Sequence, residues 1–524
     1  MGGSIAQYFT GVDYLLSLPM LLLTIFAVGI LLIDLLLPAE MKWINPLLAL
    51  IGVAFAAGGV YSINRWFNLH SPLSAQVGFM GTLLVDRYAL YFFYLFLAGT
   101  AVAIFMSAKY LEIERENHGE YYALMLFSVV GMMCMAAAFD VVLLFIGLEL
   151  MAISTYVLVG FLRRDKRSNE AALKYMLLGA FSSGIFAYGL SLLYGLTGTT
   201  NLALIGLGLT RRLAQLQGHP DPVMILAVLT TATGLLFKIA AVPFHQWAPD
   251  AYEGAPTSIT GFMSVSVKAA GWAMLLRVFG YPLRYGNAVY PLGLLPLRSA
   301  YVPFLVFVSI ATMTGANFAA LTQNNLKRLL AYSSIAHVGY MLLGLVAGTS
   351  TALNEDGLKG ILVYLLVYTF MNLGAFAVIT SLRQRNVIGD EIDDIAGLYS
   401  RSPVEAVLML FFLLSLAGIP PLAGFWGKYF IFLSLVESGH YVLAGLGVLY
   451  SVFGLYYYLR VANAAFMREP IEKEKVALSP ALGIALAITA FATLAIGIYP
   501  QPMIQSVNWV WGLTQSTPIA HLVR

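Results

Sequence analysis

The feature that most limits how this chain can fold is a regular series of apolar stretches. Each is about 20 residues long, the length of helix that crosses a bilayer core of about 30 Å. Only 10% of the 524 residues are charged, whereas soluble domains carry about 25%. The sequence therefore predicts an all-α, integral, multi-pass membrane protein. We count fourteen such stretches, near residues 14–37, 45–63, 86–107, 121–139, 141–162, 172–197, 222–243, 257–280, 300–321, 328–348, 359–381, 403–435, 440–465 and 478–499.

The composition excludes several classes of function. A net charge of +3 is too small to indicate a nucleic-acid partner. The single cysteine, Cys134, lies in an apolar run, and there is no CxxC pattern for zinc or an iron–sulfur cluster. There is also no glycine-rich phosphate loop, HExxH or GxSxG motif. We therefore expect no cofactor or metal bound by this chain, and no redox centre of its own.

Loop charges and weak internal repeats predict the topology. Basic residues concentrate in the loops after odd-numbered stretches, such as the run Arg163–Arg167, which places those loops on the cytoplasmic side. Motifs recur at offsets of 183–185 residues, for example at Tyr156 and Tyr340. Five stretches separate the partners, so the second copy is inverted, as in many transporters. We predict one membrane domain with three helices in 1–115, a first five-helix repeat in 120–280, an inverted second repeat in 300–466 and a last helix at 478–499.

Two stretches contain proline at matching places in the repeat. Pro243 interrupts the seventh stretch, and Pro420 and Pro421 interrupt the twelfth. Proline removes a backbone donor and clashes with the preceding turn, so it kinks or breaks a helix. A simple kink is one interpretation. The alternative that we favour is a functional break in both helices, because each lies beside a lysine and paired interruptions mark transporter sites.

Several titratable residues lie inside the apolar stretches, where a charge costs at least about 2.5–3.5 kcal/mol and usually marks an ion or proton path. The candidate site residues are Glu149, Lys174, Lys238, Lys268, His337 and Lys428. Lys174 lies near a helix end, so it could instead extend to the membrane interface. His337 could be a hydrogen-bonded structural histidine. For Glu149, Lys238 and Lys268 the alternative is a static ion pair between helices. The run Tyr456–Tyr458 is interpreted as an aromatic belt or as helix packing.

Burial of these residues supplies a proton-transfer chemistry. Desolvation weakens the hold of a lysine on its proton, and a nearby carboxylate strengthens it. We therefore expect Glu149 and Lys238 to form a switching pair, Lys268 to act as a central relay and Lys428 as a terminal site. His337 would link the two halves of the molecule. Ser333 and Ser334 beside it could hold bridging waters.

Three long motifs resemble those of the antiporter-like membrane subunits of complex I. They are the stretch Lys238–Thr257, the stretch 326–340 around His337, and the stretch 415–428 that ends at Lys428. Within the family the chain is most similar to the subunit 2, or subunit N, type. The resemblance implies that Glu149 and Lys238 match the key glutamate and lysine of spans 5 and 7. It equally matches Lys174, Lys268 and Lys428 to family lysines of spans 6, 8 and 12.

The resemblance also implies an assembly. Residues 169–183 and 193–195 look like the cyanobacterial and plastid form, which implies a thylakoid NAD(P)H- or ferredoxin-plastoquinone oxidoreductase. Quinone, iron–sulfur clusters and the electron donor would then be handled by other membrane and peripheral subunits, with lipids as further partners. Two rival functions stay open: a subunit of a multisubunit cation/proton antiporter, and a membrane scaffold that does not pump.

Overall fold

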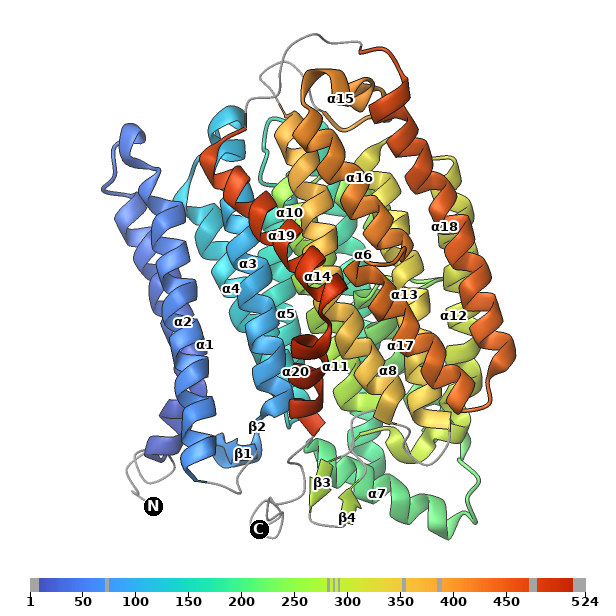
Figure 1. Ribbon diagram of the computed structural model, residues 1–524. Coiled ribbons are helices and arrows are strands. Elements are labelled where there is room, and N and C mark those ends of the chain that lie inside the picture. Colours follow the sequence, from blue (N-terminus) through green and yellow to red (C-terminus); the bar gives the residue numbers. More distant parts are fainter. Residues whose placement is uncertain are drawn as a thin grey trace.

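The computed structural model describes residues 9–70, 75–279, 283–285, 288–290, 293–350, 355–383, 389–470 and 478–511. Within this part of the chain, twelve helices are long and apolar enough to cross a membrane. The long helices lie roughly side by side in one bundle (Figure 1). The all-α membrane fold is therefore confirmed. The predicted twelfth span is built from two shorter helices. In the predicted seventh span, one helix ends at Lys238, before Pro243, and the next begins at Trp247, beyond the predicted bound.

The N-terminal part contains three spanning helices and a hairpin. The first two helices pack against each other at one edge of the bundle (Figure 1), and the hairpin joins the second to the third. Asp86 ends the hairpin and caps the third helix by accepting a hydrogen bond from the backbone N–H of Ala89 (2.8 Å). The elements are α1 (Gly11–Asp34), α2 (Ile44–Leu69), β1 (Ala75–Gly78), β2 (Leu83–Asp86) and α3 (Arg87–Glu114), and β1 pairs antiparallel with β2.

The next part contains the first broken helix. Its elements are α4 (Gly119–Ala137), α5 (Val141–Val159), α6 (Lys166–Thr197), α7 (Leu202–Gln215), α8 (Pro222–Lys238), α9 (Trp247–Gly254), α10 (Thr257–Phe262), α11 (Lys268–Phe279), β3 (Leu283–Tyr285) and β4 (Ala288–Tyr290). A π-helical turn, Met263–Val267, joins α10 to α11 directly before Lys268. Such turns inside helices are frequent at functional sites.

The remaining part contains the second broken helix. Its elements are α12 (Arg298–Leu321), α13 (Leu326–Ser350), α14 (Glu355–Leu382), α15 (Leu398–Arg401), α16 (Pro403–Ala417), α17 (Ala423–Glu437), α18 (Tyr441–Met467), α19 (Pro480–Ile498) and α20 (Gln501–Trp511). Helices α13 and α14 lie at the centre of the bundle, and most of their residues are buried. Helix α13 contacts both α9, after the first break, and α17, after the second, while α14 contacts α10, α16 and α17.

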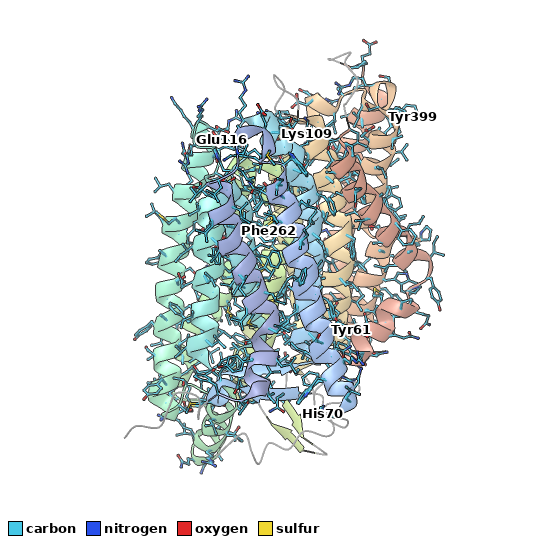
Figure 2. The ribbon with its side chains drawn as sticks, turned by 90° about the vertical axis from the view of Figure 1, so that its left-hand side faces the viewer. Tyr61, His70, Lys109, Glu116, Phe262 and Tyr399 are labelled. Carbon is cyan, nitrogen blue, oxygen red and sulfur yellow. The ribbon has the colours of Figure 1, made fainter. Side chains whose placement is uncertain are left out.

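The two ends of the helix bundle differ in their loops and short elements. Figure 2 shows Lys109 and Glu116 at the upper end and His70 at the lower end. The upper end holds loops that follow odd-numbered spans, which the basic residues assign to the cytoplasmic side. The lower end holds α7 and both hairpins (Figure 1). The predicted boundary at residue 280 and the basic residues Arg385, Lys473 and Lys475 lie outside the described residues.

Candidate functional site

The first helix break lies where α8 ends at Lys238 and α9 begins at Trp247. Backbone groups freed at a break must find partners inside the protein. The side chain of Trp247 donates to the carbonyl oxygen of Phe237 (2.8 Å), and the N–H of Val242 donates to the hydroxyl of Thr312 on α12 (3.0 Å). The break at Pro243 is therefore held open by a helix from the other half of the molecule.

The second break lies between α16 and α17. Gly418 ends α16 with a φ of 90°, a left-handed conformation that favours glycine. The amine of Lys428 donates to the carbonyl oxygen of Ala417 (2.7 Å), one of the carbonyls left free at the end of α16. A cation at a helix C-terminus is also favoured by the helix dipole. The predicted break at Pro420 and Pro421 thus positions Lys428. The Val242–Pro243 and Pro420–Pro421 bonds are both cis.

The glutamate and lysine of the first half lie near each other without touching. Lys238 on α8 is only 4% exposed, and Glu149 on α5 is half-buried. Glu149 lies close enough for its charge to act on Lys238, yet these two described side chains form no ion pair. The Lys238 amine lies 5.8 Å from the centre of the Tyr156 ring instead. The static ion pair considered from the sequence is therefore absent between these residues in this conformation.

Several buried polar atoms around this pair lack a hydrogen-bond partner within the described chain. They are Glu149 Oε1, Tyr156 Oη, Ser182 Oγ, Ser183 Oγ, Thr231 Oγ1 and Lys238 Nζ, from α5, α6 and α8. Buried polar groups are normally satisfied by protein or by ordered water. These atoms are therefore candidates for hydrogen bonds to ordered water within α5, α6 and α8.

The central lysine and the histidine lie on neighbouring helices. Lys268 on α11 donates to the hydroxyl of Ser334 on α13, and His337 lies one turn further along α13. His337 is 1% exposed. Its Nδ1 lies 2.5 Å from the hydroxyl of Tyr364 on α14, and its Nε2 lies 3.1 Å from the hydroxyl of Tyr458 on α18. The prediction that His337 lies between the halves is consistent with this position.

The candidate residues form a row across the molecule. Helix α8, with Lys238, contacts α11, with Lys268, and α13, with His337, contacts α17, with Lys428. Lys268 and Lys428 both lie close enough for their charges to act on His337. The Lys428 amine lies 5.1 Å from the centre of the Tyr340 ring. This arrangement suits the transfer of a small cation or of protons along the middle of the bundle.

Lys174 lies outside this row. Its side chain is 47% exposed and forms ion pairs with Glu170 (2.7 Å) and Asp250 (2.9 Å). Asp250 also pairs with Arg328 of α13 (2.7 Å). Lys174 thus lies two turns into α6 with an exposed, doubly paired amine, which is consistent with the interfacial alternative. There it connects α6 to α9, the short helix after the first break.

Sequence reasoning missed a polar cavity at the cytoplasmic end. The cavity has a volume of about 370 Å³ and is lined by charged side chains of both signs. Lys327 pairs with Asp390 there (3.2 Å) and donates to the carbonyl oxygen of Ala255 (3.1 Å), while Arg383 pairs with Glu114. Burial raises the pKa of Asp390 above its ordinary value, although Lys327 acts in the opposite direction. The four charged residues come from different loops and helix ends, so no sequence spacing signals the cavity.

The tyrosines around His337 were also missed. Of the run Tyr456–Tyr458, only Tyr456 is largely exposed, as an aromatic belt requires. Tyr458 is buried, and its hydroxyl lies 2.5 Å from that of Ser333 as well as near His337. The available signal was the position of Tyr458 two residues past Tyr456, on another face of α18.

Comparisons with known proteins agree on one family. Residues 138–454 match the family described as NADH:quinone oxidoreductase/Mrp antiporter, TM. The chain is 63% identical over 514 residues to NADH-quinone oxidoreductase subunit N 1 of Koribacter versatilis (strain Ellin345), covering 98% of each chain. A chain of respiratory complex I from Thermus thermophilus with bound aureothin has a TM-score of 0.75 and 31% identity, covering 93% of this chain and 99% of that chain. A chain of the Mrp complex from Dietzia sp. DQ12-45-1b shares the fold, with a TM-score of 0.75, 19% identity and coverage of 97% of this chain and 99% of that one.

Proposed function

The chain belongs to the NADH:quinone oxidoreductase/Mrp antiporter family, in its subunit N branch, and we propose that it translocates protons within an NADH-quinone oxidoreductase complex. The residues that we propose carry the protons are Glu149, Lys238, Lys268, His337 and Lys428. The observation that carries the proposal is the row that these buried groups form between the two helix breaks. Charges at this depth are rare in membrane proteins and usually mark an ion or proton path.

In the proposed mechanism, protons enter from the cytoplasmic cavity at Asp390 and Lys327. When Glu149 approaches Lys238 through bridging water, the carboxylate stabilises the ammonium form. When they separate, desolvation favours release of the proton. Lys268 relays the charge, His337 links the halves, and Lys428 is the terminal site. Moving one proton against 100 mV requires about 2.3 kcal/mol, so it is enough if quinone reduction elsewhere in the complex drives these changes of partner with a coupling energy of a few kcal/mol.

The chain belongs to a family of subunits of an enzyme complex, NADH-quinone oxidoreductase. The names of its relatives describe NADH-quinone oxidoreductase subunits N, and the solved relative is part of respiratory complex I. We propose that other membrane and peripheral subunits bind the nicotinamide, the iron–sulfur clusters and the quinone. Lys174 would then stabilise α9 at the surface rather than carry protons, because its amine is already paired twice.

We propose NADH as the donor and a bacterial plasma membrane as the location, since the relatives are bacterial proteins named for NADH. A ferredoxin-driven, plastoquinone-reducing thylakoid complex is the second candidate, and residues 169–183 and 193–195 are the observation in its favour. Membranes that contain the complex would be supplied with NADH or with reduced ferredoxin. Quinone reduction by ferredoxin alone would select the photosynthetic form.

The role of the row is tested with Glu149→Gln, Lys268→Ala and Lys428→Ala in vesicles that contain the assembled complex. NADH-driven acidification should fall by about tenfold or more in each, equivalent to at least about 1.4 kcal/mol in the limiting barrier. Lys109→Ala is the control, because Lys109 forms an exposed pair with Glu112. If all three variants assemble and pump like the control, the chain is a scaffold and the proposed mechanism is wrong.

The alternative function, as a subunit of a multisubunit cation/proton antiporter, is tested by the subunit composition of the isolated complex. The likeness to the Dietzia Mrp chain is one of fold alone. We expect the complex isolated from native membranes to contain a peripheral arm with quinone-reductase subunits, identified by mass spectrometry. An isolated complex with cation-antiporter subunits and no such arm would favour the alternative.

A further inference from the structure

Both ring nitrogens of His337 are engaged by tyrosine hydroxyls from different helices. Tyr364 reaches Nδ1 from α14 at 2.5 Å, and Tyr458 reaches Nε2 from α18 at 3.1 Å. All three side chains are at least 98% buried. Among the described residues, His337 therefore sits between two hydroxyl groups, with no carboxylate or backbone carbonyl on either nitrogen.

A neutral imidazole has one N–H donor and one acceptor nitrogen. A hydroxyl can donate or accept. Both hydrogen bonds of the His337 ring can therefore form in either tautomer, provided that one tyrosine donates while the other accepts. A carbonyl or carboxylate partner would have fixed one tautomer. The sandwich of Tyr364, His337 and Tyr458 is thus a site where the proton on the ring can change nitrogen without loss of a hydrogen bond.

The sandwich connects to both central lysines. On one side, Tyr458 lies 2.5 Å from the hydroxyl of Ser333, whose neighbour Ser334 accepts from Lys268. On the other side, the Tyr364 ring packs on Gly427, the residue before Lys428, where an added Cβ would lie 3.1 Å from a ring carbon. The hydrogen-bonded groups Ser333, Tyr458, His337 and Tyr364 thus lie between the helix segments that carry the two lysines.

We infer that Tyr364 and Tyr458 are proton-relay residues, which together with His337 and Ser333 pass protons between the Lys268 side and the Lys428 side. In one passage, Tyr458 gives its hydroxyl proton to Nε2 and regains one from Ser333, and Ser333 regains one from the ammonium group on the Lys268 side, which becomes a neutral amine. Nδ1–H gives its proton to the oxygen of Tyr364, which releases its own toward the amine of Lys428. No other bond changes, and the ring ends as the opposite tautomer. One passage therefore moves one proton, and the ring must exchange its proton between the nitrogens again before the next passage.

This inference rests on the proposed proton-translocating function and adds two tyrosines and a serine to it. The test uses Tyr364→Phe, Tyr458→Phe and Ser333→Ala in membranes that contain the complete complex. NADH-driven acidification is measured in H₂O and D₂O and normalised to the amount of assembled complex. Tyr301→Phe is the matched control, because its buried hydroxyl donates to the carbonyl oxygen of Phe279 (2.6 Å) and takes no part in the row.

Each relay variant is expected to slow acidification by about tenfold or more, at the low end of what positioned proton transfer contributes, and to change the ratio of the rates in H₂O and D₂O. Tyr301→Phe should leave both unchanged. Because the tyrosines act with His337, Tyr364→Phe added to His337→Ala should cost little beyond His337→Ala alone. Ser333→Ala removes only one oxygen atom. If a tyrosine variant assembles poorly, the relay can still be tested with this variant.

The relay is refuted if the assembled variants match Tyr301→Phe in rate and isotope ratio, or if the losses in the double variant are fully additive. Lys268→Ala separates the relay from the wider mechanism. If Lys268→Ala stops pumping while the tyrosine variants pump normally, the relay is wrong and the lysine row stands. If Lys268→Ala also pumps normally, the proposed function itself is wrong.

Discussion

Buried cations in this protein fall into two kinds, and the difference lies in their partners. Arg277 is held by the carboxylate of Asp86 through two hydrogen bonds of 2.7 and 2.5 Å. Lys268 and Lys428 instead donate to neutral oxygens, and Lys238 has no hydrogen-bond partner within the described chain. A counter-ion stabilises the charged form of a buried cation, whereas a desolvated lysine with neutral partners can lose its charge at lower cost. This distinction separates the row from the static ion pairs.

Lys238→Met tests that distinction. Replacing a desolvated cation that has no counter-ion by an apolar side chain of similar length removes its desolvation cost. We therefore expect the variant complex to have an unchanged or higher unfolding temperature while NADH-driven acidification is lost. Thermal unfolding and pumping are measured on the same preparation. A marked loss of stability would instead show that Lys238 is a structural residue.

Asp390→Asn tests the cytoplasmic cavity. Burial raises the pKa of Asp390, so the folded protein binds this proton more tightly than the unfolded chain does. The contribution of Asp390 to stability is therefore largest at low pH. It falls as pH rises from about 3.9, the ordinary aspartate value, through the raised value. The stability of the native protein relative to Asp390→Asn should decline over that range. A difference that stays constant or grows with pH in thermal unfolding would contradict this assignment.

At the scale of elements, the two broken helices are kept open by tight packing around their breaks. The side chain of Trp426 on α17 donates to the carbonyl oxygen of Gly497 on α19 (2.9 Å), which holds the last spanning helix against the second break. The N–H of Gly424 donates to the hydroxyl of Ser415 across that break (3.2 Å). Lys428 keeps its place only while α16 and α17 hold this arrangement.

Gly424→Ala should disturb the second break. A Cβ at this position would overlap the backbone carbonyl of Ser415, which cannot rotate away as a side chain can. We expect α17 to shift and acidification to fall by about tenfold or more, comparable to the loss of a catalytic contact. Gly445→Ala is the control, because nothing lies within 4 Å of an added Cβ there. Equal pumping by the two assembled variants would show that the break tolerates displacement.

Across the whole molecule, ion pairs connect segments that lie far apart in the sequence. The Arg277–Asp86 pair joins the end of α11 to the start of α3, and Arg277 also donates to the carbonyl oxygen of Ala136 at the end of α4 (3.0 Å). At the cytoplasmic end, Arg383 pairs with Glu114 across α14 and α3. These contacts lie at opposite ends of the bundle and bind the N-terminal helices to the parts that carry the row.

Arg277→Met should destabilise the whole protein, because it leaves Asp86 charged, buried and without its counter-ion. The expected cost is about 3–5 kcal/mol, as for other broken buried pairs. Arg212→Met removes a more exposed pair with Asp221 and should cost about 1 kcal/mol or less. The amount of assembled complex and its unfolding temperature are compared for the two variants. Equal losses would mean that the buried pair does not hold the helices together.

The sequence alone determined the properties that follow from local chemistry. Stretches long enough to span a bilayer predicted the helices, proline predicted the two breaks, and the cost of charge at membrane depth selected Glu149, Lys238, Lys268 and Lys428. The short helices α7 and α20 were missed, because 14 and 11 residues are too few to span a membrane. Division of the chain at 1–115, 120–280, 300–466 and 478–499 stays a prediction.

Only the tertiary structure decided which of these residues meet. It separated Glu149 from Lys238, moved Lys174 to the surface, joined Lys327 to Asp390, and placed Tyr364 and Tyr458 on His337. These partners are tens to more than a hundred residues apart. Their meeting depends on how each helix is rotated about its own axis. In an almost uniformly apolar sequence, no local pattern encodes that rotation, because it is set by the packing of each helix against its neighbours.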